Sequence, residues 1–266
     1  MRKAIVVIAL LMAGHDMGWA KPVYPRDPLG SPMWEADART LFGDDPVRFD
    51  ERVHVIFPEI AENQRVFPVA VDARGIAGVE RIVLFADLNP IPVAVDYRPI
   101  AAEPYLATRI KLDQRTPVRG AVQLADGSWL VSGGWIDAAG GGCSAPPVSR
   151  VKGDWAQHLG EMRGEALASK DGARLRVTFR HPMDTGLVEH IATYYIETVS
   201  VKDSGGKLLG DMNIWASVSE DPAFTILPAA HVGETLTIDA RDTNGRDYGG
   251  RIKVSPQSSR KLVLGQ

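Results

Sequence analysis

Short runs of β-branched and aromatic residues recur along most of this chain, and they constrain its fold more than any other feature. The first series begins at Val53 and continues to Val131, with Gly, Pro, Asn and Asp between the runs. Short apolar runs at intervals of roughly 8–12 residues, separated by turn residues, are typical of β-sandwiches. The pattern therefore predicts an all-β fold.

The series is interrupted once, which predicts two domains. Residues 138–147 read AAGGGCSAPP, and such a mixture of glycine and proline does not continue a strand. A second β-rich series starts near Ala173. We expect one β-sandwich over residues 53–137, an arm and linker over 138–170, and a second β-sandwich over 171–266.

The N-terminus has the features of a secretory signal peptide over residues 1–20. Arg2 and Lys3 precede a short apolar run, and Gly18 and Ala20 are the small residues before a cleavage site. The run is too short to cross a bilayer, which needs about 20 apolar residues. We expect export to the periplasm, with no membrane span after cleavage. Residues 21–52 then form a Pro-rich leader that contains a short helix over 34–42.

Cys143 is the only cysteine among the 266 residues, so it cannot form a disulfide within the chain. In an exported protein, a single cysteine indicates a reactive thiol or pairing with another chain. A buried structural cysteine is the alternative, and the Gly- and Pro-rich surroundings argue against burial. We expect Gly140, Gly141 and Gly142 to give the arm freedom, and the small residues after Cys143 to leave its sulfur exposed.

Several segments resemble two families of sulfur-oxidation proteins, SoxY and SoxZ, in the right order over about residues 53–254. The segments similar to the core of SoxY are 59–63, 66–71, 89–92 and 108–111, and the glycine run ending at Cys143 looks like its cargo arm. The segments similar to SoxZ are 176–187 (RVTFRHPMDTGL), 195–199 and 242–245.

This resemblance implies two immunoglobulin-like β-sandwich domains. SoxY and SoxZ are separate periplasmic chains that pair, and the SoxY cysteine covalently carries sulfur intermediates between enzymes of thiosulfate oxidation. Here both are fused, which is similar to the SoxYZ-like carriers found beside quinoprotein dehydrogenases. We expect the two halves to pack together and Cys143 to be the attachment site. The expected partners are sulfur-oxidation enzymes or a quinoprotein dehydrogenase system.

The arm departs from the SoxY pattern at one point. The SoxY arm is a C-terminal tail ending in Gly-Gly-Cys-Gly-Gly, whereas Cys143 is followed by Ser144-Ala145-Pro146-Pro147 and the second domain. The arm is therefore a loop held at both ends, and we expect a shorter reach.

His181 and Met183 lie in the segment that resembles the opening of SoxZ. Because Cys, His and Met suit copper, the alternative to the carrier is a copper-binding or interaction module that serves a periplasmic quinoprotein dehydrogenase. The simpler interpretation is the end of a strand, because Pro182 has no N–H to continue the hydrogen bonding between strands. We expect no metal, and we place His181 and Met183 beside the thiol or at a partner surface.

No catalytic constellation stands out in the sequence. Glu59 and Glu62 have the chemistry of an acid–base pair, but we expect them in an exposed loop. The three glycines lack the Gly-Lys-Ser/Thr ending of a phosphate loop. A net charge of −3 without a basic stretch makes nucleic acid a poor partner. We expect a carrier with no catalytic residue and no cofactor.

Overall fold

The structure, a computed structural model, describes residues 24–257 and confirms the all-β prediction. The predicted helix is present as α1 (Trp34–Phe42). The first half of the chain forms the strands β1 (Val47–Phe49), β2 (His54–Ile56), β3 (Phe67–Asp72), β4 (Val79–Ala86), β5 (Val93–Arg98), β6 (Ala102–Ile110), β7 (Thr116–Leu124) and β8 (Trp129–Ile136). The predicted signal peptide lies outside the described residues.

The second half forms seven further strands after a short helical linker. The linker contains α2 (Val148–Lys152) and the 3-10 helix η1 (Trp155–Gln157). The strands are β9 (Met162–Ser169), β10 (Gly172–Phe179), β11 (Ile196–Lys202), β12 (Leu208–Ile214), β13 (Ala223–Pro228), β14 (Thr235–Asp242) and β15 (Asp247–Ser255).

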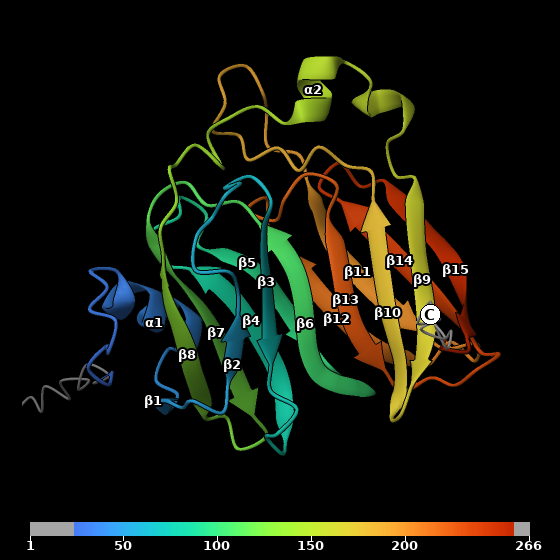
Figure 1. Cartoon of the computed structure of the whole chain (residues 1–266), viewed down its shortest axis with the longest axis horizontal. Helices are drawn as coiled ribbons and strands as arrows, with labels where there is room; N and C mark the ends of the chain where they lie inside the picture. Colours follow the sequence, from blue (N-terminus) through green and yellow to red (C-terminus); the bar gives the residue numbers. More distant parts are fainter. Residues whose placement is uncertain (1–23, 258–266) are drawn as a thin grey trace, which may run out of the picture.

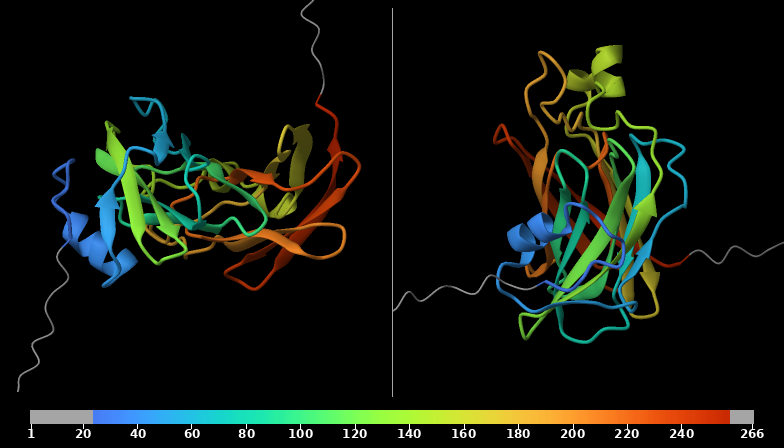
Figure 2. Two further views of the ribbon diagram at one scale, coloured as in Figure 1. Left: turned by 90° about the horizontal axis from the view of Figure 1, so that it is seen from below. Right: turned by 90° about the vertical axis from the view of Figure 1, so that its left-hand side faces the viewer.

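The strands form two facing layers, seen from two further sides in Figure 2. One layer has the order β1-β8-β7-β4-β5-β12-β11-β14-β15, and the other has the order β2-β3-β6-β13-β10-β9. A short parallel pairing of β15 with β9 joins the layers at one end. Alternating inward and outward residues, as in the BeBeB pattern of β10 and β14, place an apolar face of each layer inside the sandwich.

Both layers run without a break from the first half of the chain to the second. β5 pairs with β12 in one layer, and β6 pairs with β13 in the other, both antiparallel. The two sandwiches thus join edge to edge (Figure 1), and each covers strand edges that the other would leave unpaired. A single hydrophobic cluster also continues through both halves, from Leu84 and Ile110 to Phe179 and Val199. The expected packing of the halves is therefore present as two shared sheets.

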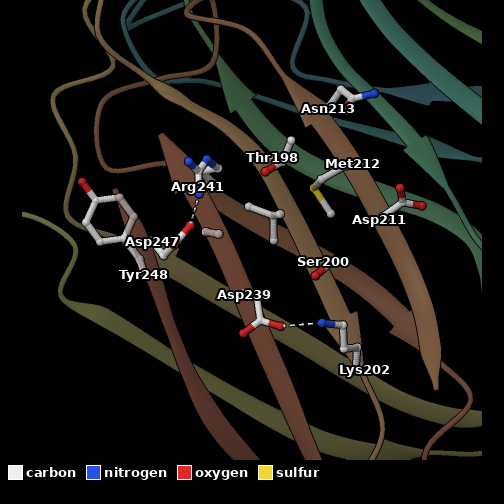
Figure 3. Close-up of a pocket in the computed structure, with 12 residues that line it drawn as sticks. Thr198, Ser200, Lys202, Asp211, Met212, Asn213, Asp239, Arg241, Asp247 and Tyr248 are labelled. Atoms are coloured by element: carbon white, nitrogen blue, oxygen red, sulfur yellow. Dashed lines mark hydrogen bonds and ion pairs between the residues drawn. The ribbon is translucent and has the colours of Figure 1, made fainter. Parts of the chain in front are cut away.

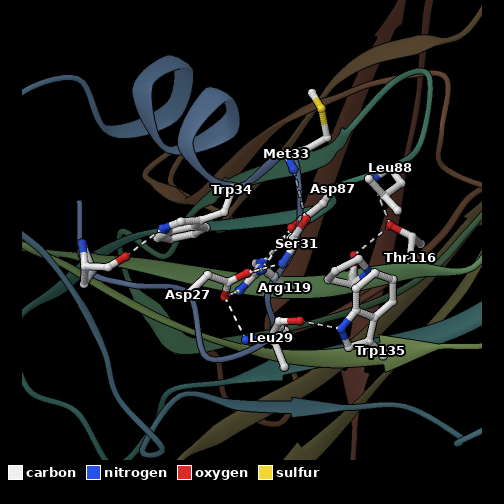
Figure 4. Close-up of polar contacts among 12 residues, drawn as sticks. Asp27, Leu29, Ser31, Met33, Trp34, Asp87, Leu88, Thr116, Arg119 and Trp135 are labelled. Atoms are coloured by element: carbon white, nitrogen blue, oxygen red, sulfur yellow. Dashed lines mark hydrogen bonds and ion pairs between the residues drawn. The ribbon is translucent and has the colours of Figure 1, made fainter. Parts of the chain in front are cut away.

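The N-terminal leader is fixed to the outer face of the first half, as Figure 4 shows. The guanidinium of Arg119 on β7 is fully buried and forms ion pairs with Asp27 at 2.7 Å and with Asp87 at 2.9 Å. Trp34 of α1 lies over the same guanidinium, 4.8 Å from ring centroid to Cζ. Because a buried charge is stable only when it is paired, this network anchors residues 27–34 to the sheet.

The structure departs from the sequence-based boundaries at two places. β1 lies inside the predicted leader and pairs in parallel with β8. β9 lies inside the predicted linker and pairs along its whole length with β10. Within residues 24–257, no helix is long and apolar enough to cross a membrane.

Candidate functional site

The arm that carries Cys143 crosses the end of the molecule where the two halves meet. It leaves β8 in the first half and runs to α2, which lies at the top of Figure 1, before the chain enters the second half. Glu220 of the second half holds the start of α2, because its carboxylate accepts hydrogen bonds from Val148 N and Ser149 N, both at 2.7 Å. Arg65 of the first half donates to Pro146 O at 3.2 Å. Both halves therefore hold this segment.

Cys143 is buried, so the prediction of an exposed sulfur is wrong. The residue is 1% exposed, whereas the next residue, Ser144, is exposed. Burial raises the pKa of the Cys143 thiol to about 12, the cation of Lys111 opposes this rise, and the carboxylate of Asp113 adds to it. The thiol is therefore protonated and protected from solvent at neutral pH.

Two side chains from opposite halves hold the backbone around Cys143. Asp113 Oδ1 accepts hydrogen bonds from Cys143 N at 3.0 Å, from Ser144 N at 3.1 Å and from Ser144 Oγ at 3.0 Å. From the second half, Thr185 Oγ1 donates to Cys143 O at 2.6 Å. The cysteine is thus clamped between the SoxY-like and SoxZ-like halves.

The structure gives a reason for each of the three glycines of the arm. A Cβ at position 142 would lie 2.4 Å from both Gln64 O and Leu112 O, so no larger residue fits there. Gly140 and Gly141 have φ values of +95° and +79°, which favour glycine. Gln64 Nε2 also donates to Gly140 O at 2.8 Å. Greater freedom of the arm stays a prediction, whereas close packing explains the glycines at 140 and 142 and the positive φ explains the glycine at 141.

Lys111 is a second buried polar residue at this junction. It follows β6 directly and is 5% exposed. Its ammonium donates to Ala216 O at 2.8 Å and to Met183 O, and both acceptors belong to the second half. Burial lowers the pKa of Lys111 to about 8, although Cys143, Asp184 and Glu220 raise it. Lys111 therefore links the halves beside the thiol.

His181 and Met183 are buried in the second half, so their prediction as a partner surface is wrong. They are 2% and 0% exposed. Met183 N donates to His181 Nδ1 at 3.1 Å, and Met183 Sδ accepts from Ile196 N at 3.4 Å. Burial lowers the pKa of His181 to about 3. A place beside the thiol stays a prediction: Met183 O accepts from Lys111, and Thr185, two residues further along the chain, donates to Cys143 O.

The ligand geometry gives no support to the copper alternative. Within the described part of the chain, no group of three or more His, Cys, Asp and Glu side chains is arranged to hold a metal ion. The Met183 sulfur already has a backbone partner, and the neighbours of the His181 ring are Tyr194 and Asp242. Glu59 and Glu62 are exposed, as predicted.

A surface pocket lies on the outer face of β11, β12, β14 and β15 (Figure 3), and Cys143 is not among the residues that line it. Its volume is about 490 Å³. Lys202 pairs there with Asp239, and Arg241 pairs with Asp247, each at 2.9 Å. These ion pairs are solvent-exposed, and such pairs contribute little to stability.

Cys143 is predictable from the sequence, whereas the residues that hold it are not. Asp113, Lys111 and Thr185 all lie in or beside segments that resemble SoxY or SoxZ. The sequence offered no local signal that these three side chains meet at Cys143.

Comparisons with known proteins divide the chain at the same place as the structure. Residues 38–143 match the sulfur oxidation protein SoxY, and residues 162–253 match the sulphur oxidation protein SoxZ. No curated protein gives a significant match. The sulfur carrier protein SoxY from Chlorobium limicola f thiosulfatophilum is similar at 21% identity, over 40% of this chain and 91% of that chain, with a TM-score of 0.36. CopC from Methylosinus trichosporium OB3b is similar at 15% identity, over 38% and 94%, with a TM-score of 0.24.

The two matches follow one another in chain order and leave only the segment with α2 and η1 between them. The first match ends at Cys143 itself. The chain therefore joins a domain of the SoxY family, over residues 38–143, and a domain of the SoxZ family, over residues 162–253, in a single polypeptide.

Proposed function

We propose that this chain is an exported, non-enzymatic carrier that holds a sulfur-containing intermediate covalently on Cys143 and presents it to partner enzymes in the periplasm. The observation that carries the proposal is the position of the only cysteine. Cys143 is the last residue of the SoxY match and lies at the junction with the SoxZ half. Enzymes of sulfur oxidation are the partners that these families favour, and a quinoprotein dehydrogenase system is the other class of partner.

Loading of the carrier is a thiol–disulfide type of exchange. The Cys143 thiolate attacks one sulfur of a donor that contains an S–S bond, a new S–S bond forms on Cys143, and the donor sulfur leaves with the electron pair of the broken bond. The thiol proton goes to water, and the S–S bond of the donor is the oxidant that is reduced, so no further oxidant is needed. With thiosulfate as the donor, Cys143 and the outer sulfur of thiosulfate become joined by a new S–S bond. This reaction requires a redox partner that removes two electrons, and it releases the thiol proton.

The buried position of the thiol suits the storage of a bound intermediate while the carrier moves from one partner enzyme to the next. In the closed arm, an adduct would be shielded from stray thiols, whereas transfer requires the arm to open. Opening breaks the three hydrogen bonds to Asp113 and the one from Thr185, each worth about 1 kcal/mol. A docking partner can supply an interaction free energy of this size.

The proposal is tested by replacing the thiol in the native cell. Cys143→Ser changes one atom, so the fold and the export of the protein should be unaffected. We expect sulfur-compound oxidation to be lost, while Ser204→Ala, in the exposed hairpin between β11 and β12, retains it. Normal oxidation by the Cys143→Ser strain would overturn the proposal.

A further inference from the structure

The short helix α2, which follows the arm, turns an apolar face to solvent. Val148 and Val151 are 45% and 73% exposed, and residues three apart lie on the same face of a helix. The two residues between them face the protein, because Ser149 is buried and Arg150 pairs with Asp184. A surface helix normally turns its polar face to water, so the outward valines of α2 require another explanation.

Two further exposed apolar side chains lie on the loops that contact the arm. Ile60 is 66% exposed, and it forms an isolated parallel bridge with Asp137 just before the arm. Leu187 is 46% exposed, and its amide donates at 3.3 Å to Thr185 Oγ1, the hydroxyl that holds Cys143 O. The loop between β10 and β11, which contains Leu187, projects at the same end of the molecule as α2 (Figure 1, Figure 2).

These four side chains form a group that we call the arm-end surface: Ile60, Val148, Val151 and Leu187. Eight large apolar side chains are exposed within residues 24–257, and half of them belong to this group. Single exposed apolar residues are ordinary, whereas a group of them is typical of a protein interface. The arm-end surface therefore has the character of an interaction site, and it lies around the segment that carries Cys143.

The exposed charged residues beside the arm-end surface are mostly acidic. Three of them are glutamates: Glu59, Glu62 and Glu189. One exposed lysine, Lys152 of α2, opposes them, while Arg115 at this end is paired with Asp137 at 2.6 Å. The apolar group is thus surrounded by an excess of negative charge.

This charge disfavours a second copy of the chain as the occupant of the surface. Two copies related by a two-fold axis would place the arm-end surface against itself. The glutamates of one copy would then face those of the other, and like charges across an interface are unfavourable. The complementary occupant is a different protein, with an apolar surface and basic residues around it.

We propose that the arm-end surface is the docking site of the enzyme that loads Cys143, and that this enzyme presents an apolar surface with basic residues at its rim. This inference rests on the proposed carrier function. Because the surface consists of α2 and of loops from both halves that contact the arm, an enzyme bound there lies next to Cys143. Its small size suits a carrier, which has to leave each partner, because transient complexes bury less than about 1,200 Å². Opposite charges at the rim speed the encounter.

The test measures the loading of Cys143 in the native cells. Thiosulfate is added to washed cells, and the rate at which an adduct appears on Cys143 is followed by intact mass. Val151→Asp places a carboxylate in the apolar surface, and we expect loading to be at least about tenfold slower, as for the loss of a central interface residue. Glu62→Lys reverses one charge of the rim and should slow loading about threefold.

Two matched controls make the same substitutions at the opposite end of the molecule. Val232→Asp changes a valine that is 56% exposed, in the loop after Pro228, which pairs with Ala102 at the end of β6 far from the arm. Glu80→Lys changes an exposed glutamate of β4 next to Val79, in the part of that strand that pairs with the end of β7. Both variants should load at the wild-type rate.

Two measurements on the purified proteins separate docking from other roles of the surface. Alkylation of Cys143 by iodoacetamide should be equally fast in wild type and in Val151→Asp, and a changed rate would assign the effect to the arm and overturn the inference. Wild type should sediment as a monomer. A wild-type dimer that Val151→Asp converts to a monomer would assign the surface to a second copy and overturn the inference as well.

The outcome in cells also separates this inference from the carrier function on which it rests. Equal loading of Val151→Asp and Val232→Asp would overturn the docking site and leave the carrier function standing. A wild-type protein that gains no adduct on Cys143 would overturn the carrier function and the docking site together.

Discussion

The carboxylate of Asp113 accepts a hydrogen bond from the backbone amide of Cys143 at 3.0 Å. The same oxygen also holds both donors of Ser144, so one side chain of the first half fixes the arm. Asp113→Ala removes three hydrogen bonds of about 1 kcal/mol each and should open the arm. We expect alkylation of Cys143 by iodoacetamide to become at least about tenfold faster, as measured by intact mass.

A matched control for this variant is Asp203→Ala. Asp203 Oδ1 also accepts backbone hydrogen bonds, from Gly205 N and Lys207 N, but in the hairpin between β11 and β12. In Asp203→Ala, the rate of alkylation of Cys143 should equal the rate in wild type. An unchanged rate in Asp113→Ala would mean that something other than this carboxylate holds the arm closed.

The closed arm should lose stability at alkaline pH. Burial raises the pKa of the Cys143 thiol to about 12, compared with about 8.5 when it is exposed. For an acid whose pKa is raised in the folded state, the stabilisation is complete below the exposed pKa and is lost as the pH rises toward the folded one. In wild type, the alkylation rate should therefore keep rising well above pH 9, whereas in Asp113→Ala it should level off nearer pH 9. Matching pH profiles for the two proteins would contradict the burial of the thiol.

The second half should be sensitive to acid through His181. Burial lowers its pKa to about 3, compared with about 6.5 in an unfolded chain. The stability of the neutral buried ring is complete above about pH 6.5 and is lost as the pH falls toward 3. His181→Asn retains an acceptor for Met183 N but does not titrate. We expect the stability difference between wild type and this variant, from urea unfolding, to fall by up to about 1.4 kcal/mol per pH unit.

His190→Asn is the control for that experiment, because the His190 side chain is 90% exposed. Its stability difference from wild type should be independent of pH. An equal pH dependence in both variants would show that His181 is not the group that titrates.

The buried ion pairs of Arg119 should fix the N-terminal leader. Arg119→Met leaves the carboxylates of Asp27 and Asp87 buried without a cation, and a broken buried pair of this kind costs about 3–5 kcal/mol. The exposed pair of Arg98 with Asp211 provides the comparison, because Arg98→Met should cost no more than about 1 kcal/mol. Urea unfolding measures both. Equal losses of unfolding free energy in Arg119→Met and Arg98→Met would contradict the anchoring role of Arg119.

Local sequence patterns were sufficient for the fold class and for α1, since strand runs, turn residues and the spacing from Trp34 to Phe42 are local properties. The edge pairings β5–β12 and β6–β13 were not predictable, because no local signal tells which strand edges meet. β9 was hidden in the linker, since its residues (MRGEALAS) carry few β-branched side chains.

The identity of the site was predictable, and its environment was not. Cys143 stood out as a single cysteine beside glycines. Its burial depends on Asp113 and Thr185, which are 30 and 42 residues away in sequence, and such contacts exist only after both halves have folded. Gly142 is an example. The sequence predicts conformational freedom at this glycine, whereas in the structure the missing Cβ lets the arm pack against Gln64 O and Leu112 O.

The most direct test of the carrier function is the intact mass of the mature protein isolated from its own cells during growth on reduced sulfur compounds, with and without reductant. We predict that a fraction of the protein carries an added mass that maps to Cys143, is removed by reductant and is absent from Cys143→Ser. A Cys143 that stays unmodified in all of these preparations would contradict it.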